Sequence, residues 1–289
     1  MKTGLILEGG AMRGLFSAGL MDAFLENGID FDGVIGVSAG AAFGCNYISR
    51  QKGRVLRYNT RFSRDKRYCS VRSLLTTGDL YNADFCYHEI PEKLDVLDRE
   101  TFIRNPAEFY VVCTDVLTGR PVYRKLEKMD YKDLELMRAS ASMPLVSGIV
   151  RIDDCCLLDG GISDAIPVRY FESIGYDRNV VVLTRPEGYL KKKTKLLALF
   201  KIVYKKYPHL VSAMERRHET YNETLEYIRR KEKNGDLLVI RPEKALPIGK
   251  IEHNADKMRV VYSIGRQAGE RCAGQVKDFL SGATDFSRS

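Results

Sequence analysis

The chain has 289 residues, of which 44% are hydrophobic, and a formal net charge of +8. A chain of this length and composition buries enough apolar surface for a sizeable core, which excludes a disordered tail and a peptide-sized module. The seven cysteines lack the spacing of metal ligands, so they indicate reduced thiols in a reducing compartment and no metal site. The positive charge attracts anions in general, including nucleic acid, acidic metabolites and anionic lipid headgroups.

The chain opens with a short apolar run rather than with a targeting segment. Residues 4–7 are followed by Glu8, which ends the run. The opening is therefore too short for a signal peptide or a membrane span. We expect a soluble, cytoplasmic protein.

Apolar runs bounded by glycine or proline alternate along the chain with stretches of helical periodicity. The runs cover residues 4–7, 33–37, 109–113, 156–158, 179–183 and 237–240, and the helical stretches cover 14–26, 39–51, 130–141 and about 255–280. Short buried strands that alternate with helices predict an α/β fold. We expect a three-layer sandwich in which helices cover both faces of a mainly parallel central sheet.

Two late strands indicate how the chain is divided. Residues 181–186 (VVLTRP) and 238–242 (LVIRP) end alike, which suggests that both belong to one sheet. We expect a main domain in residues 1–186 and a C-terminal extension in residues 187–289. The extension would contain a basic helical segment, a further strand near 237–241 and a final helix, all packed on the same domain.

A glycine-rich loop joins the first strand to the first helix. Its residues are Glu8, Gly9, Gly10, Ala11, Met12, Arg13 and Gly14. Successive backbone N–H groups at a helix N-terminus form a cradle for a phosphate or for an oxyanion. Because Ala11 replaces the middle glycine of a dinucleotide-binding loop, and no Gly-Lys-Ser/Thr triplet follows, nucleotide binding is disfavoured. Arg13 has three interpretations: a brace for the loop, a contact for a lipid phosphate, or an ordinary surface residue.

The next strand ends in the sequence Gly36-Val37-Ser38-Ala39-Gly40. A serine between two glycines at a strand-to-helix turn has the context of a nucleophile elbow, which exposes the serine oxygen at the top of a sheet. The simpler alternative is a glycine-rich turn with a capping serine. A catalytic serine here would favour an oxyanion hole over a phosphate site in the preceding loop.

A third pattern, Leu157-Leu158-Asp159-Gly160-Gly161, places an aspartate at the end of an apolar strand. Such an aspartate can orient and deprotonate a serine on a neighbouring strand. An Asx-turn is the simpler alternative.

A catalytic triad would need a histidine, and the chain has four: His88, His209, His218 and His253. The last three lie in strongly charged surroundings, and His88 precedes Asp159, so each is predicted to be a surface residue. The order serine, aspartate, histidine of an α/β-hydrolase is met only with His253 following a late strand. A histidine-dependent esterase therefore remains an alternative.

Residues 189–207 are basic, with apolar and aromatic residues interleaved. As a helix, this stretch could rest on an anionic bilayer with its lysines outward and Leu196, Leu199, Phe200 and Val203 buried, which would place the protein peripherally at the inner membrane face. The alternative is an amphipathic helix that packs on the domain, and we favour it over the membrane contact.

The glycine-rich loop with Arg13, the Ser38 elbow and the Asp159 triplet resemble, in order and spacing, the motifs of the patatin-like phospholipase family. Residues 138–144 (RASASMP) resemble the segment that precedes the aspartate in that family, and the resemblance covers residues 4–169. It implies a Ser-Asp dyad without histidine, an oxyanion hole from the backbone of Gly9, Gly10 and Ala11, and hydrolysis of acyl esters of lipids without a cofactor. Ala11 departs from the family, whose loop usually carries a third glycine at this place.

The sequence therefore predicts a serine acyl hydrolase of lipid metabolism, of the phospholipase A or lipid esterase type, with Ser38 as nucleophile and Asp159 as general base. Residues 1–186 would form its catalytic domain. The supporting motif residues are Arg13, Gly14, Gly36, Gly40, Gly160 and Gly161. Small apolar residues after the elbow suit an acyl chain, although helix packing explains them equally well: Ala39, Ala41, Ala42 and Phe43. The alternatives are the histidine-dependent esterase and an inactive lipid-binding module; nucleic acid is not expected as a partner, because no recognition motif accompanies the basic residues.

Overall fold

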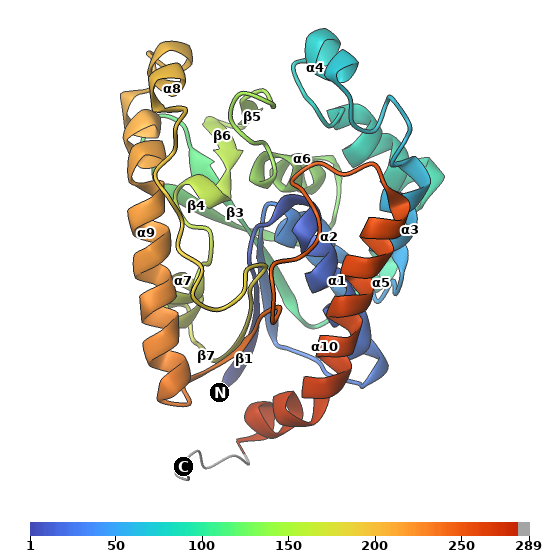
Figure 1. Cartoon of the computed structure of the whole chain (residues 1–289). Coiled ribbons are helices and arrows are strands. Elements are labelled where there is room, and N and C mark those ends of the chain that lie inside the picture. The colour runs from blue at the N-terminus through green and yellow to red at the C-terminus, as the bar shows by residue number, and fades with distance from the viewer. Residues whose placement is uncertain (283–289) are drawn as a thin grey trace.

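The protein is built around one sheet of eight strands, seen in the computed structural model, which describes residues 1–282 (Figure 1). The order across the sheet is β5-β6-β3-β2-β1-β7-β8, and β4 also pairs with β3. The strands are β1 (Lys2–Leu7), β2 (Gly33–Val37), β3 (Glu108–Asp115), β4 (Pro121–Leu126), β5 (Val150–Ile152), β6 (Cys155–Asp159), β7 (Tyr176–Val182) and β8 (Leu237–Ile240).

The core of the sheet is parallel, as predicted. β1 runs parallel to β2 and β7, β2 to β3, and β7 to β8. The remaining pairs, β3 with β4, β3 with β6 and β5 with β6, are antiparallel. The six predicted strands are all present, and two were missed. β4 is half-exposed and polar and β5 has only 3 residues, so neither carries a buried apolar run.

Helices cover both faces of the sheet. They are α1 (Gly14–Glu26), α2 (Ala39–Ile48), α3 (Arg54–Phe62), α4 (Val71–Thr77), α5 (Arg99–Arg104), α6 (Tyr131–Ser140), α7 (Val168–Ser173), α8 (Leu197–Val203), α9 (Pro208–Lys233) and α10 (Ala255–Ser281), with the short 3₁₀-helices η1 (Ala11–Arg13) and η3 (Gly160–Ile162) and the π-helix η2 (Phe85–Leu94). The helix predicted over 39–51 ends earlier, because the chain turns through Arg50, whose φ is +56°.

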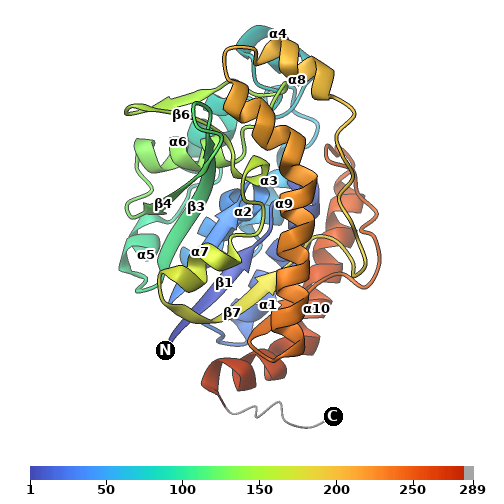
Figure 2. The ribbon, with the colours of Figure 1, turned by 90° about the vertical axis from the view of Figure 1, so that its left-hand side faces the viewer.

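Alternate side chains of the strands enter two separate cores. Leu5 and Leu7 of β1 pack with residues of α1, α2, α3, α6 and α10 on one face. Ile6 lies between them in sequence and packs with α7 and α9 on the opposite face. This period of two is the one expected of a strand buried on both sides. Figures 1 and 2 show the resulting three layers, with α9 on one side of the sheet and α10 on the other.

The residues after Pro186 contribute to the sheet and to both of its covering layers. β8 extends the sheet beside β7. α10 lies along α1, where Tyr262 donates a hydrogen bond to Asp22 and Arg266 pairs with Glu26.

The prediction of one helix over 189–207 is wrong. Only α8, with 7 residues, is helical there. The backbone of Lys191 is bound instead to the Asn222 side chain on α9, with N–H to Oδ1 2.8 Å and Nδ2 to carbonyl oxygen 3.0 Å. Phe200 packs into the protein, whereas Leu196, Leu199 and Val203 are exposed. Among the described helices, none has both the length and the apolar character that crossing a bilayer requires.

Candidate active site

Ser38 lies at the sharp turn between β2 and α2. Its φ of 55° and ψ of −119° fall in a region that costs an L-residue on the order of 1–3 kcal/mol. The flanking glycines allow the turn because a Cβ added to Gly36 would lie 2.3 Å from the Gly40 carbonyl oxygen, and one added to Gly40 would lie 2.4 Å from that of Leu7. The strand-to-helix elbow expected from the sequence is present.

A second serine holds this turn in place. The backbone N–H of Ser38 donates to Ser140 Oγ at 3.0 Å, and Ser140 Oγ donates to the Val112 carbonyl oxygen at 2.6 Å. Ser140 is fully buried near the end of α6. Its positioning role was not identified from the sequence, although it lies inside the segment 138–144.

Asp159 ends β6 and is 4% exposed. Its Oδ1 accepts the Gly161 N–H at 2.7 Å, and the Ser38 side chain lies near enough to act on the pKa of this carboxyl group. Its own backbone N–H donates to the Ser142 carbonyl oxygen at 2.8 Å. The structure thus brings together the serine and the aspartate, 121 positions apart in the sequence by their numbers.

Burial raises the pKa of the Asp159 carboxyl group above its ordinary value. The charge of Arg217 opposes that shift most strongly, followed by the nearby Ser38 side chain, the hydrogen bond from the Gly161 N–H and the charge of Lys191. A carboxylate with a raised pKa is a stronger base than a solvated one. Asp159 therefore has the electrostatic setting that proton abstraction requires.

The glycine-rich loop passes directly beside the elbow. A Cβ added to Gly9 would lie 3.1 Å from Ser38 Cβ. The backbone N–H groups of Gly9, Gly10 and Ala11 donate to no acceptor within residues 1–282. The buried Glu8 side chain anchors the loop, since its Oε1 accepts from the Tyr221 hydroxyl at 2.6 Å. Three free donors next to a serine oxygen suit a developing oxyanion.

Ala11 adopts a φ of +48°, so the position does use the left-handed region. An L-residue there costs about 1 kcal/mol more than a glycine once the higher chain entropy of glycine is counted. The departure from the usual glycine therefore strains the loop but keeps the N–H donor.

The supporting glycines allow close contacts around the site. A Cβ added to Gly14 would lie 2.9 Å from Ala39 Cβ, and one added to Gly160 would lie 2.2 Å from the Val112 carbonyl oxygen. Arg13 is half-buried, and its Nε has no hydrogen-bond partner among the described residues.

None of the four histidines borders the cavity at Ser38. His88 pairs with Glu135 at 2.9 Å and stacks on Tyr131. The ring of His253 contacts the Ser63 carbonyl oxygen at 2.6 Å, and the partners of His218 are Glu215 and Glu219. No histidine of the described chain is placed to act as the base for Ser38.

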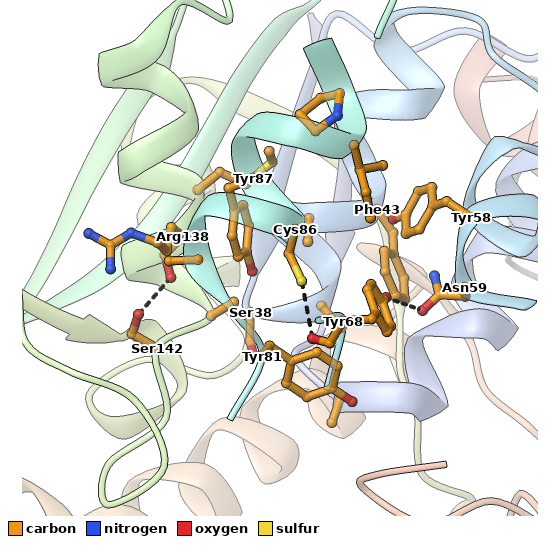
Figure 3. Close-up of a pocket in the computed structure, with 18 of the residues that line it drawn as sticks. Ser38, Phe43, Tyr58, Asn59, Tyr68, Tyr81, Cys86, Tyr87, Arg138 and Ser142 are labelled. Atoms are coloured by element: carbon orange, nitrogen blue, oxygen red, sulfur yellow. Dashed lines mark hydrogen bonds between the residues drawn. The ribbon is translucent and has the colours of Figure 1, made fainter. Parts of the chain in front are cut away.

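A cavity of about 130 Å³ extends from Ser38 between α2, α3, η2 and α6 (Figure 3). Of the small apolar residues singled out after the elbow, Ala39, Ala42 and Phe43 line it, whereas Ala41 is buried elsewhere. Four tyrosines also line the cavity and were not recognised in the sequence: Tyr58, Tyr68, Tyr81 and Tyr87. A mostly apolar cavity that starts at the serine suits an acyl chain.

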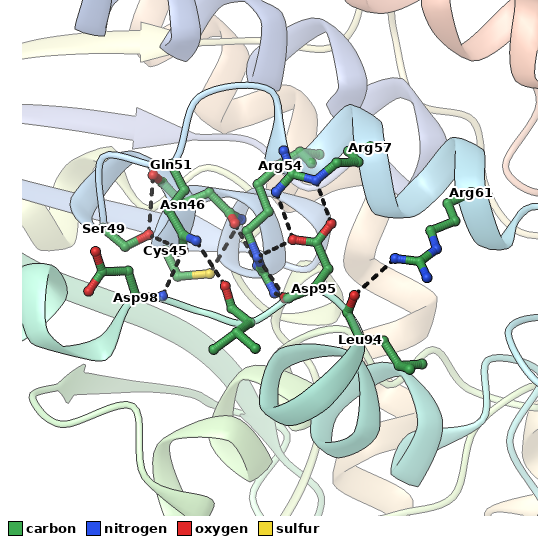
Figure 4. A network of polar contacts seen from close by, with 12 residues as sticks. Cys45, Asn46, Ser49, Gln51, Arg54, Arg57, Arg61, Leu94, Asp95 and Asp98 are labelled. Atoms are coloured by element: carbon green, nitrogen blue, oxygen red, sulfur yellow. Dashed lines mark hydrogen bonds and ion pairs between the residues drawn. The ribbon is translucent and has the colours of Figure 1, made fainter.

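A buried ion pair fixes the inner wall of this cavity (Figure 4). Arg54 borders the cavity, and its Nε lies 3.3 Å from Asp95 Oδ1, with the two side chains only 4% and 5% exposed. Arg54 also donates from Nη1 to Asn46 Oδ1 at 2.7 Å. From the solvent side, Arg57 donates two hydrogen bonds of 2.7 Å to the same Asp95 carboxylate. The network ties α3 to the chain that leaves η2.

An α/β sandwich with a strained serine at a strand-to-helix elbow and free N–H donors beside it is the architecture of an elbow-type serine hydrolase. The chain belongs to the patatin-like phospholipase family, whose sequence model matches residues 5–172. The resemblance predicted from the motifs is confirmed, and family membership implies hydrolysis of lipid esters. A domain of unknown function is matched over residues 207–281.

Similar proteins are found in several bacteria. The chain is 26% identical over 303 aligned positions to the uncharacterized protein YjjU of Escherichia coli strain K12, covering 99% of this chain and 81% of that protein. It is 23% identical to the uncharacterized NTE family protein Rv1063c of Mycobacterium tuberculosis strain H37Rv, over 63% of this chain and 48% of that protein. Among solved structures, VipD from Legionella pneumophila aligns with a TM-score of 0.42 and 14% identity, over 93% of this chain and 67% of VipD.

Proposed function

We propose that the chain is a serine acyl hydrolase that cleaves carboxylic esters of lipids with a Ser38–Asp159 dyad. The observation that carries the proposal is the buried Asp159 carboxyl group, whose pKa is raised by burial and on which the Ser38 side chain acts from close by. The absence of a histidine beside the cavity, among the residues described, supports a dyad over a triad.

In the proposed reaction, Asp159 takes the proton of Ser38 Oγ while this oxygen attacks the ester carbonyl carbon. The N–H groups of Gly9, Gly10 and Ala11 stabilise the oxyanion that forms on the carbonyl oxygen. When this tetrahedral intermediate collapses, the bond to the leaving alcohol breaks, and the alcohol takes the proton from Asp159. Water then attacks the acyl-serine and gives a proton to Asp159, and the free acid leaves as Ser38 regains its hydrogen.

Ser38→Ala is expected to reduce hydrolysis of a phospholipid and of a short-chain chromogenic ester by at least about 10⁴-fold, because the variant lacks the oxygen that attacks the ester carbonyl carbon. A fluorophosphonate probe should label the wild type at one site and leave the variant unlabelled, as measured by intact-mass spectrometry. Labelling of Ser38→Ala at another residue would contradict the assignment.

The histidine-dependent alternative is tested with His253→Ala. This variant should retain wild-type turnover within about twofold, since the ring contacts a backbone carbonyl on the surface. Loss of activity in His253→Ala with activity kept in Asp159→Asn would replace the dyad by a triad. Lipid binding by the wild type without any turnover would instead identify an inactive lipid-binding module.

We also propose that the end of the molecule formed by α4 and α8 contacts an anionic bilayer. Both helices lie at the same end of the molecule in Figures 1 and 2. Ile202 on α8 is 70% exposed and Leu75 on α4 is 81% exposed. Exposed lysines accompany the α8 residues: Lys195, Lys201 and Lys205. Apolar side chains flanked by lysines are the chemistry that binds anionic lipid, as on the inner face of a cytoplasmic membrane.

Ile202→Ser is expected to weaken sedimentation with vesicles that contain an anionic phospholipid by about tenfold. The variant loses an aliphatic side chain that the bound protein would insert into the bilayer. Ile103→Ser on α5 is the matched control, since Ile103 is 56% exposed and α5 lies away from this end. Thermal unfolding of both variants checks their folding. Equal binding by the two variants would rule out α8 as the contact.

A further inference from the structure

Five cationic side chains lie near one another and near Asp159, as their effects on one another's pKa indicate. They are Arg13 in η1, Arg185 and Lys191 in the connection after β7, Arg217 on α9 and Lys250 in the connection after β8. None of them lines the cavity proposed for the acyl chain. The cluster therefore lies outside that cavity.

Arg217 places the cluster next to the catalytic carboxylate. Its Nε donates to the Gly161 carbonyl oxygen. A Cβ added to Gly161 would lie 3.2 Å from Arg217 Nη2 and 2.9 Å from Asp159 Oδ1. The Arg217 guanidinium and the Asp159 carboxylate thus both lie within 3.2 Å of the position that a Cβ of residue 161 would occupy.

Aromatic rings hold two other cations in position. Lys191 Nζ lies 4.1 Å from the centroid of the Tyr221 ring, and the Arg185 guanidinium lies 4.6 Å from that of Tyr189. The two hydrogen bonds between the Lys191 backbone and Asn222 fix the connection on α9. Held side chains lose little entropy when they bind a ligand.

The charges of the cluster are not neutralised by the protein. Within residues 1–282 none of the five cations forms an ion pair, whereas most other arginines of the chain do. Two acids lie near the cluster. One is Asp159, beside Arg217. The other is Glu8, which raises the pKa of Arg13 and of Lys191 and whose two oxygens already accept from Tyr221 and Thr184. The buried Arg13 Nε has no partner among these residues.

Burial and repulsion by neighbouring cations lower the pKa of three members of the cluster, Arg13, Lys191 and Lys250. Burial, followed by the charge of Arg217, lowers the pKa of Lys191 to about 8. Burial also lowers the pKa of Arg13, with Arg185 as the next cause, and that of Lys250, with Arg217 as the next cause. Half-buried like charges held together in this way are stabilised by a bound anion.

We propose that this cluster is a subsite that binds the phosphate group of the lipid substrate while the acyl chain lies in the separate cavity that starts at Ser38. The inference rests on the proposed hydrolase function and narrows its substrates to phosphate-bearing lipids. Guanidinium groups match phosphate oxygens with paired N–H donors, and an ammonium group adds a point charge.

The test compares two lipids with the same acyl chains, phosphatidylcholine and diacylglycerol, each dilute in micelles of a neutral detergent. The zwitterionic lipid tests for phosphate without giving the micelle a net charge. Its kcat/KM relative to that of diacylglycerol is measured for the wild type and for Arg185→Gln/Lys191→Gln. The matched control is Lys244→Gln/Lys277→Gln, which removes two exposed charges that form no ion pair within the described chain.

The ratio of kcat/KM for phosphatidylcholine to kcat/KM for diacylglycerol should fall at least tenfold in Arg185→Gln/Lys191→Gln, equivalent to about 1.4 kcal/mol. It should stay within twofold of the wild-type ratio in the control. Lys191→Gln alone, which keeps its carbons on Tyr221, serves if the double variant does not fold. An unchanged ratio overturns the proposal. Thermal stabilisation of the wild type by inorganic phosphate together with an unchanged ratio overturns it too, because the cluster would then bind free phosphate. Failure of the wild type to cleave both lipids and a chromogenic ester would reject the hydrolase function itself.

Discussion

Asp159→Asn is expected to lower the kcat for a lipid ester by about 10³- to 10⁴-fold while the protein stays folded. Asparagine keeps the shape of the side chain and can still accept the Gly161 N–H that Asp159 Oδ1 accepts at 2.7 Å. It cannot take the proton of Ser38, because an amide is not a base at neutral pH. The loss therefore isolates proton transfer from the positioning of the nucleophile.

The same change should leave the free energy of unfolding at neutral pH equal or higher. The folded-state pKa of Asp159 is raised, chiefly by burial. For a group of this kind the stabilising contribution is present below the unfolded-state pKa and is lost as the pH rises through the folded-state pKa. At neutral pH the ionised carboxylate thus destabilises the wild type, and asparagine removes that cost. The stability difference between the two proteins should shrink as the pH is lowered and Asp159 becomes protonated.

Two measurements check this prediction. The wild-type kcat/KM should rise with pH through the pKa of Asp159 and then level, and the residual activity of Asp159→Asn should lack that acidic limb. Denaturant unfolding at neutral and acidic pH supplies the stability difference. Retention of more than a tenth of the wild-type kcat in Asp159→Asn would mean that another group accepts the serine proton.

The turns that form the candidate site could be predicted from the sequence because each of them is local. Gly36 and Gly40 flank Ser38 within five residues, and the backbone approaches of 2.3 and 2.4 Å explain why both must be glycine. The glycine-rich loop follows β1, and β1 and β2 are parallel neighbours. Since equivalent ends of adjacent parallel strands meet at one edge of a sheet, local motifs sufficed to bring loop and serine together.

The features that the sequence did not predict depend on contacts between distant parts of the chain. Ser140 acts on the Ser38 backbone across 102 positions, and nothing in its own neighbourhood distinguishes it from a helix-terminal serine. The cluster around Arg217 draws on three separate connections and one helix, whose lysines and arginines look like ordinary surface charges in sequence.

The wrong prediction over 189–207 has the same origin. Its apolar and basic residues have a helical pattern, yet a tertiary contact of Lys191 with Asn222 holds the first part of the stretch in a non-helical conformation. Tertiary hydrogen bonds to α9 outweigh a propensity that is worth only tenths of a kcal/mol per residue.

Asp95→Ala is expected to lower the free energy of unfolding by about 3–5 kcal/mol, because it leaves the buried Arg54 guanidinium without its counter-ion. Arg54 is 4% exposed in its side chain, so water cannot replace the carboxylate without opening the wall of the cavity. The loss is measured by urea unfolding at neutral pH, with circular dichroism as the signal.

Two controls separate this buried charge from ordinary surface effects. Arg57→Gln removes the other partner of Asp95, but Arg57 is 53% exposed, so its loss should cost less than about 1 kcal/mol. Asp98→Ala removes an aspartate that caps α5 by accepting the Thr101 N–H at 2.9 Å, and should cost about 1 kcal/mol. A cost for Asp95→Ala no larger than these two would show that Arg54 finds another acceptor or reaches solvent. Arg54 also borders the cavity. A large cost would therefore show that one ion pair supports both the stability of the fold and the wall of the proposed acyl-chain cavity.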